Sequence, residues 1–295
     1  MTGHALVGTC SWTDRALVTS GWYPPGSRDA EGRLRHYAAR FPVVEVDSSY
    51  YALPSARNSR LWAERTPDGF RFDVKAFAPL TGHPVTVGAL PPGLRPAGPL
   101  TARLRPGDLP PDVVAELWDL FDAGLEPLRE AGRLGAVLFQ FPPWFAPGGP
   151  AYDRLAECRA RCGDTMAVEF RHPGWFAPDR LPEAVDFLKA RDIAFTAVDT
   201  VQGLPRSLPP VAPVTSDGLA LVRLHGRSPE WGTGSKEDRF RHRYTPEELV
   251  PWADRVRRMT EQAERVHVLF NNCCADAAVS AAALMTELLA EDHPG

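Results

Sequence analysis

The sequence predicts an α/β protein built as a single TIM-type (β/α)8 barrel. Apolar, strand-like segments alternate with amphipathic helical segments over the whole chain, and most connections between them are short. This order implies parallel strands joined by right-handed crossovers. We expect eight strand segments, and eight is the number of strands that closes a barrel of this type. A doubly wound open sheet is the alternative. That fold usually carries a glycine-rich phosphate-binding turn after its first strand, whereas Gly8 is followed by TCSW.

The predicted strands are short runs rich in β-branched and aromatic residues. Alternation at period two places Glu45 and Asp47 on one face of the second strand. The same alternation places Arg223, His225 and Arg227 on one face of the seventh strand. The eight strands are expected within residues 6–12, 43–51, 70–77, 135–142, 166–175, 193–200, 219–227 and 265–274.

Seven helices are predicted from apolar residues at helical spacing and from their end signals. The pattern TPEE at Thr245 is a capping box, and Pro127 is expected to kink or split its helix. Residues 201–218 are rich in proline, so the helix between strands six and seven is expected to be missing or irregular. The helices are expected at residues 33–41, 55–66, 112–132, 152–162, 181–191, 245–264 and 276–289.

Residues 78–111 are dense in proline and glycine and look too interrupted for regular structure. They are expected to form a long loop or a lid. Nothing else in the composition marks a boundary, so residues 1–295 are expected to form one domain.

Composition narrows the classes of function. The formal net charge of -4 argues against a generally basic, nucleic-acid-coating surface, although a local basic groove is compatible with it. No apolar run approaches the length of roughly 20 residues that a membrane span needs, and no secretion signal opens the chain. Five cysteines, an odd number, do not suggest a disulfide framework. We therefore expect a cytoplasmic protein with reduced thiols and no membrane partner.

Polar side chains are concentrated where the predicted strands end, and in a parallel barrel all these ends meet at one mouth. The sequence MAVEFRHPGW, residues 166–175, is the clearest case, because an acid, an arginine and a histidine follow an apolar run. Such groups are costly to bury unless they pair with each other or with a ligand. The candidate catalytic residues are Glu169, His172, Asp47, His225 and Glu45, and the candidate substrate-binding residues are Lys75, Arg171, Arg223, Arg227, Asn271, Asn272, Gln140, Trp12, Tyr50 and Asp199.

The chemistry of these residues favours acid–base catalysis on an anion. Two carboxylates in unlike surroundings can serve as general acid and general base, and arginine forks match carboxylate or phosphate groups. Glu169 and Arg171 are equally compatible with a purely structural ion pair. A divalent metal is possible but not favoured, because cations lie among the carboxylates and no metal-binding spacing is present. Cys10 could approach Cys273 or Cys274 where the first and last strands meet, although buried packing is the commoner role of such cysteines.

Several motifs in order resemble the YecE-like family, catalogued as domain of unknown function 72, over nearly the whole chain. These are GTCSW, WYPPG, FPVVEVDSSYY, FRFDVKAF, LFQFPP, VEFRHPGWF, VRLHGR and VLFNN. The resemblance implies a TIM-type barrel of unassigned activity, loosely grouped with sugar-isomerase-like barrels. This chain differs from the family pattern at Cys273 and Cys274 and in the proline-rich loop, where residues 81–83 match a threonine–histidine stretch only in part.

The sequence thus favours an enzyme, isomerase-like or hydrolase-like, that acts on an anionic sugar-like or phosphorylated small molecule. One alternative is a phosphodiesterase-like, nuclease-like or nucleic-acid-binding barrel that uses arginines on a backbone and aromatic rings on bases. The other is a non-catalytic ligand-binding protein. A deep pocket would favour the small molecule, and a long basic track would favour nucleic acid.

Overall fold

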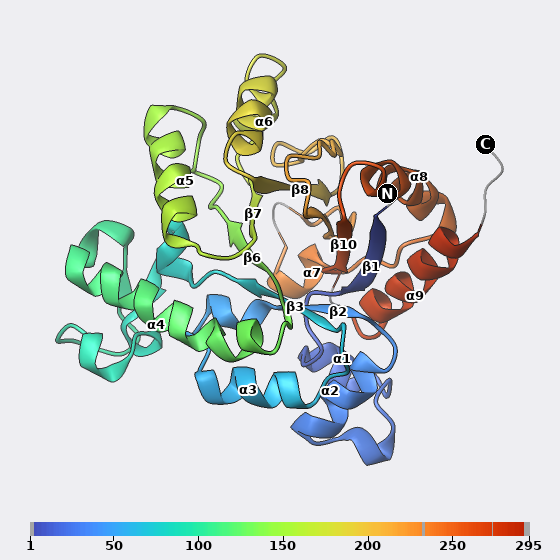
Figure 1. The fold of residues 1–295 in the computed structure, drawn as a ribbon, viewed down its shortest axis with the longest axis horizontal. Coiled ribbons are helices and arrows are strands. Elements are labelled where there is room, and N and C mark those ends of the chain that lie inside the picture. The colour runs from blue at the N-terminus through green and yellow to red at the C-terminus, as the bar shows by residue number, and fades with distance from the viewer. Residues whose placement is uncertain (1–2, 232–233, 273, 292–295) are drawn as a thin grey trace.

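Eight parallel strands close into a barrel, as the sequence predicts, and helices surround it (Figure 1). The computed structural model describes residues 3–231, 234–272 and 274–291. Around the barrel the strands follow the order β1, β10, β9, β8, β7, β6, β3 and β2. Their bounds are β1 His4–Thr9, β2 Val43–Val46, β3 Arg71–Lys75, β6 Leu134–Gln140, β7 Met166–Glu169, β8 Ile193–Asp199, β9 Ala220–Leu224 and β10 Arg265–Phe270.

The helices fill the connections between these strands, with one exception. No helix lies between β8 and β9, where residues 200–219 are fully described, so the predicted gap in the helical series is confirmed. Pro127 lies inside a continuous α4, so the predicted split does not occur. The helices are α1 Arg15–Thr19, α2 Ala30–Ala38, α3 Ala56–Glu64, α4 Pro111–Glu130, α5 Gly149–Arg161, α6 Leu181–Lys189, α7 Lys236–Arg239, α8 Pro246–Thr260 and α9 Ala277–Ala290.

The alternation of strand side chains divides the apolar core into two parts. Residues that point outward pack against the helices and form the larger cluster, which includes Trp175 and Trp252. Residues that point into the barrel form a smaller cluster of mostly small and aliphatic side chains. Leu138, Ala167 and Leu221 belong to this inner cluster, and two residues further along their strands stand Gln140, Glu169 and Arg223. The inside of the barrel is therefore apolar toward the amino ends of the strands and charged toward their carboxyl ends.

The second strand is shorter than its sequence pattern predicts. β2 ends at Val46, and Asp47–Tyr50 form a 3-10 turn. The hydroxyl of Ser49 donates to the backbone carbonyls of Val46 and Lys75, both at 2.6 Å, which offers the chain an alternative to the strand ladder. The expectation that Asp47 extends the face of Glu45 is therefore wrong.

The proline-rich segment contains more regular structure than its composition suggests. β4 (Val85–Thr86) and β5 (Arg103–Leu104) pair as a small antiparallel sheet. Between β3 and this sheet lies a 3-10 turn, Ala78–Thr81, whose residues are all buried. Arg154 of α5 donates to the carbonyl of Leu80 at 2.7 Å. This contact ties the start of the segment to the helical layer.

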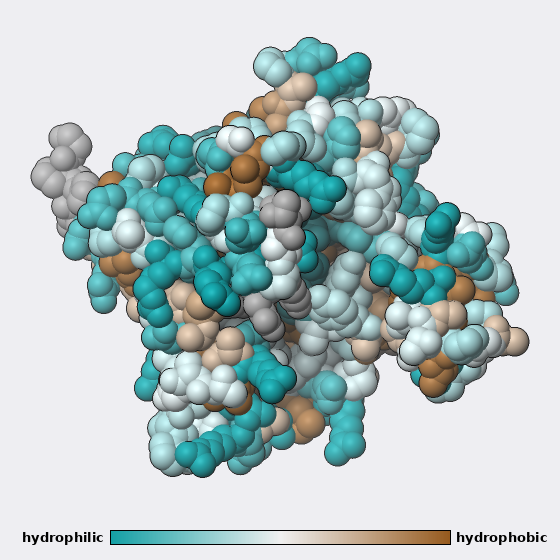
Figure 2. All heavy atoms as spheres, turned by 180° about the vertical axis from the view of Figure 1, so that it is seen from behind, coloured by the Kyte–Doolittle hydropathy of each residue, from teal (hydrophilic) through white to brown (hydrophobic). Residues whose placement is uncertain are grey.

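The outer surface is mainly polar. Seen from behind, the molecule presents hydrophilic residues over most of the face, with hydrophobic ones in separate small patches (Figure 2). Among the described residues, no helix has both the length and the apolar character required to cross a membrane.

Asp199, at the end of β8, joins the barrel to α8 beside the missing helix. It faces outward, where its carboxylate accepts hydrogen bonds from four donors. Arg227 contributes two at 2.9 Å, the Tyr244 hydroxyl one at 2.7 Å and the Trp252 indole one at 3.0 Å. Gly226 donates its backbone N–H to the same tyrosine oxygen, at a φ of 89° that favours glycine. These contacts link the end of β8 to Arg227, Tyr244 and Trp252.

We expect Asp199→Ala to lower the free energy of unfolding by about 3 kcal/mol, because buried donors lose their acceptor. Urea unfolding at neutral pH measures this change. Asp254→Ala is the matched control, because Asp254 forms a half-exposed ion pair with Arg257 that should contribute less than about 1 kcal/mol. Equal effects of the two substitutions would contradict the role of Asp199.

Candidate functional site

Arg223 is the centre of a charged network inside the barrel mouth. Its guanidinium is fully buried and binds Glu45 of β2 through two hydrogen bonds of 2.7 and 2.8 Å. The same group forms an ion pair with Glu169, at the end of β7. It also donates to the side-chain oxygen of Gln140 at 3.3 Å and lies 3.7 Å from the sulfur of Cys10. Side chains from β2, β6 and β7, and one that follows β1, thus meet on a single guanidinium that β9 supplies.

A second arginine extends this network toward solvent. Arg171 pairs with the other carboxylate oxygen of Glu169, and its side chain is 15% exposed. It also lies 3.2 Å from Nε2 of His225, whose Nδ1 is 2.9 Å from the amide nitrogen of Asn271. The guanidinium of Arg171 sits 5.5 Å from the centre of the Trp231 ring. Arg171 therefore presents a cation beside an aromatic ring at the rim.

The two carboxylates of the network differ in proton affinity. Burial raises the pKa of Glu45, and the positive charges of Arg223 and Lys75 offset only part of that effect. Burial opposes ionisation of Glu169 too, but Arg171 and Arg223 on both sides hold its pKa well below the ordinary value. Burial, followed by the charge of Arg171, lowers the pKa of His225 to about 3. Glu169 is therefore ionised and His225 neutral at pH 7.

Lys75, at the end of β3, is the third cation of the mouth. Its ammonium group lies 3.1 Å from a carboxylate oxygen of Asp47 and 4.6 Å from the centre of the Tyr50 ring. The side chain of Asp47 is 28% exposed, whereas that of Lys75 is 10% exposed, so the carboxylate is the more accessible member of the pair. The Tyr50 ring packs edge-on against His83, and the next ring along is the exposed Trp144.

A separate buried pair lies deeper in the barrel. Nδ1 of His267 on β10 is 2.9 Å from a carboxylate oxygen of Asp73 on β3. Gly135 makes room for it, because a Cβ at that position would stand 2.3 Å from Asp73 and 3.1 Å from His267. Both side chains are fully buried. We assign the pair to the interior of the barrel and not to the mouth.

The structure brings ten of the predicted site residues to the mouth and places five elsewhere. Trp12 packs against Trp62 in the outer core. His172 caps a 3-10 turn, where its Nδ1 accepts from the backbone of Gly174. Asp199 and Arg227 bind each other outside the barrel, and Asn272 donates to the carbonyl of His242. Those at the mouth are Glu45, Asp47, Tyr50, Lys75, Gln140, Glu169, Arg171, Arg223, His225 and Asn271.

The sequence also raised a possible divalent metal site and a possible approach of Cys10 to Cys273 or Cys274. Within the described ranges, no three or more histidine, cysteine or acidic side chains are grouped so as to hold a metal ion. The thiol of Cys10 donates to Glu45 at 3.6 Å. Cys273 lies outside the described residues, and the backbone of Cys274 bonds to Asn272.

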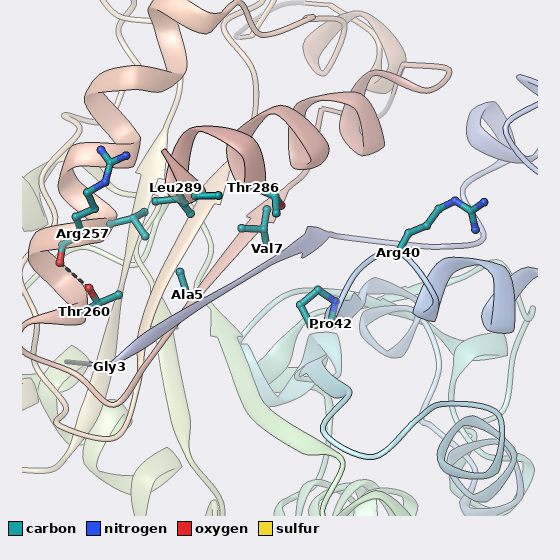
Figure 3. Close-up of a pocket in the computed structure, with 11 residues that line it drawn as sticks. Gly3, Ala5, Val7, Arg40, Pro42, Arg257, Thr260, Thr286 and Leu289 are labelled. Atoms are coloured by element: carbon teal, nitrogen blue, oxygen red, sulfur yellow. Dashed lines mark hydrogen bonds between the residues drawn. The ribbon is translucent and has the colours of Figure 1, made fainter. Parts of the chain in front are cut away.

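A groove of about 360 Å³ lies on the outer side of β1, away from the mouth (Figure 3). Ala5 and Val7 line it together with residues of α8 and α9, and Arg40 and Pro42 form the opposite wall. None of the predicted site residues lines this groove. Arg257 at its edge is already bound to Asp254 and to backbone carbonyls. The charged mouth, where acids, bases and cations converge, is therefore the better candidate for a functional site.

Two residues at the mouth were not predicted from the sequence. Trp231, beyond the end of β9, contacts both Arg171 and His225. His83 lies in the proline-rich segment, whose composition suggested only a loop. The threonine–histidine spacing of residues 81–83 was the available signal for it.

We expect Arg223→Met to lower the free energy of unfolding by about 3–5 kcal/mol at pH 7, because two buried carboxylates lose their shared cation. Chemical denaturation measures the loss. Arg180→Met, which removes an exposed arginine, should cost less than about 1 kcal/mol. A loss below that value for Arg223→Met would mean that the network contributes little.

His225 should make stability depend on pH. Its pKa in the folded protein is about 3, against an ordinary value of 6.5, so between these values the unfolded chain binds more protons. Its contribution is present above pH 6.5 and is lost as the pH falls toward 3. His225→Gln should therefore reduce the slope of unfolding free energy between pH 4.5 and 6 by up to about 1.4 kcal/mol per pH unit. An unchanged slope in urea titrations would refute this assignment.

Comparisons with known proteins agree with the geometry of the barrel. The family described as "Protein of unknown function DUF72" matches residues 6–295. UPF0759 protein YunF of Bacillus subtilis (strain 168) is 32% identical over 296 residues, which cover 98% of this chain and 96% of that protein. A DUF72 family protein of Thermotoga maritima MSB8 superposes with a TM-score of 0.78 at 28% identity, over 97% of this chain and 99% of the other. One from Enterococcus faecalis V583 gives 0.79 at 23% identity, over 98% and 97%. The chain belongs to the DUF72 family.

Proposed function

We propose that this protein is an enzyme that binds an anionic, sugar-like or phosphorylated small molecule at the barrel mouth and acts on it by acid–base chemistry. The observation that carries the proposal is the presence of two cations at the mouth, Lys75 and Arg171, whose side chains are 10% and 15% exposed. Lys75 is paired with the accessible Asp47, and Arg171 with the buried Glu169. A phosphate or carboxylate group is the natural partner of such a pair.

The surroundings of the two cations support a ring-shaped ligand. Tyr50 lies beside Lys75 and Trp231 beside Arg171, so each cation is accompanied by an aromatic face. Aromatic faces pack well against the apolar faces of sugar rings. A ligand with a ring and an anionic group would satisfy both features at once.

The residues divide into two roles in this proposal. Glu45, Glu169, Arg223 and His225 are fully buried, so they position Arg171 and do not reach a ligand. Asp47 is the accessible carboxylate, and it serves as the proton acceptor near the ligand. Proton transfer of this kind serves isomerisation as well as hydrolysis.

Thermal unfolding in the presence of candidate ligands tests the proposal. A sugar phosphate should raise the melting temperature of the wild type by several degrees, and its neutral parent sugar should not. Lys75→Met should abolish the increase, and Lys189→Met, at an exposed position on α6, should retain it. An equal response to the parent sugar, or an unchanged response in Lys75→Met, would refute the anion site.

The same screen separates the alternatives. A single-stranded oligonucleotide that stabilises the protein where mononucleotides do not would favour a nucleic-acid-binding barrel. Turnover of a bound sugar phosphate can be monitored by nuclear magnetic resonance of the ligand. Binding without turnover would favour a non-catalytic binding protein.

A further inference from the structure

His83 is a histidine of the mouth that the function described so far does not use. It follows the buried 3-10 turn Ala78–Thr81 and the left-handed Gly82, whose φ is 79°. Its Nδ1 lies 2.8 Å from the hydroxyl of Thr81, which fixes the orientation of the ring. The residue is 7% exposed. A rigid turn of the proline-rich segment thus holds an imidazole at the edge of the barrel.

The ring of His83 stands between two aromatic side chains. Its centre is 5.2 Å from that of Tyr50 and 5.9 Å from that of Trp144, both in edge-to-face contact. Tyr50 in turn carries the Lys75 ammonium over its face. The Tyr50 ring therefore contacts both His83 and Lys75, the cation proposed to bind the ligand.

His83 differs from the other two histidines considered for the site. Nδ1 of His172 is used by the backbone of Gly174, and His225 is fully buried with contacts at both nitrogens. For His83, the hydrogen bond found among the described residues uses Nδ1, so Nε2 is left for a ligand. The geometry points to His83 as the titrating group that meets a bound molecule.

We propose that Nε2 of His83 contacts the anion bound between Lys75 and Arg171, and that His83 takes up one proton from solvent as the anion binds. This inference rests on the proposed function. The protonated imidazole is then a third cationic donor to the phosphate or carboxylate group. In the bound state it is also placed to return that proton to the ligand as a general acid.

The charges around His83 explain why proton uptake accompanies binding. Burial first, and then the positive charges of Lys75 and Arg171, lower its pKa to about 4, so the free protein holds a neutral ring at pH 7. Asp47 is the acidic group bound to Lys75, and Tyr50 is the titratable group that packs on the ring. A bound anion offsets the two positive charges and raises the pKa of His83. Anion affinity must therefore rise as the pH falls from 7 toward 4.5, by about tenfold for each pKa unit of the shift.

The test uses inorganic sulfate, which keeps its charge throughout this range. Calorimetric titration of the wild type should give a dissociation constant about tenfold lower at pH 4.5 than at pH 7, with uptake of up to one proton at the lower pH. His83→Gln should bind with little pH dependence. His4→Gln is the matched control. His4 is exposed at the start of β1, the end of the strand away from the mouth, so the substitution should leave the pH dependence intact.

Nuclear magnetic resonance of the wild type provides a second readout that needs no variant. The ring signal of His83, assigned through its contacts with Tyr50 and Trp144, should titrate at a higher pH when sulfate is present. A signal that titrates at the same pH with and without sulfate would overturn the inference.

The outcomes separate this inference from the proposed function. If sulfate binds, Lys75→Met abolishes binding and His83→Gln keeps the full pH dependence, the role of His83 is refuted and the anion site stands. If sulfate fails to bind the wild type, or binds Lys75→Met equally well, the anion site is refuted and the role of His83 with it.

Discussion

The buried guanidinium of Arg223 is the constraint on which the mouth of this barrel depends. A cation without access to water is stable only if carboxylates surround it at hydrogen-bonding distance. Here Glu45 and Glu169 meet this requirement from two strands, β2 and β7, that β3 and β6 separate in the barrel order. The network therefore ties the barrel together across its interior as well as through the strand ladder.

The second consequence of this network is an outward gradient of exposure. Arg223 is fully buried, Arg171 shares Glu169 with it and is 15% exposed, and Lys75 on β3 is 10% exposed. Because Glu169 is held by two arginines, its charge is committed to them and cannot neutralise a further cation. The mouth can thus offer positive charge to a ligand although the protein carries a net charge of -4.

Much of the fold followed from the sequence because hydrophobic periodicity determines it. The alternation of strands and helices predicts the barrel, and the proline-rich residues 201–218 predict the absent helix. Parity along strands also predicts that Glu169 and Arg171 share a face, as do Arg223 and His225. Glu169 contacts Arg171, Arg223 and His225, which agrees with this prediction. Arg227, predicted on the same face as Arg223 and His225, instead binds Asp199 outside the barrel, so that part of the prediction is wrong.

The remaining site residues show where such reasoning fails. Asp199 and Asn272 stand near strand ends but face outward, because successive side chains of a strand point to opposite faces. Asp47 reaches the mouth from a turn that Ser49 stabilises, and His172 is occupied by a backbone N–H. His83 is positioned by a proline-rich turn that has no periodicity to read. Local hydrogen bonds determine the positions of Asp47, His172 and His83, and the alternation of strand residues contains no information about these three.

The most direct test of this account is a crystal structure of the protein grown with selenate, located by its anomalous signal. The account predicts selenate at the carboxyl ends of the strands, within hydrogen-bonding distance of Lys75 and Arg171. Selenate bound in the outer groove beside Arg40, with none at the mouth, would contradict it.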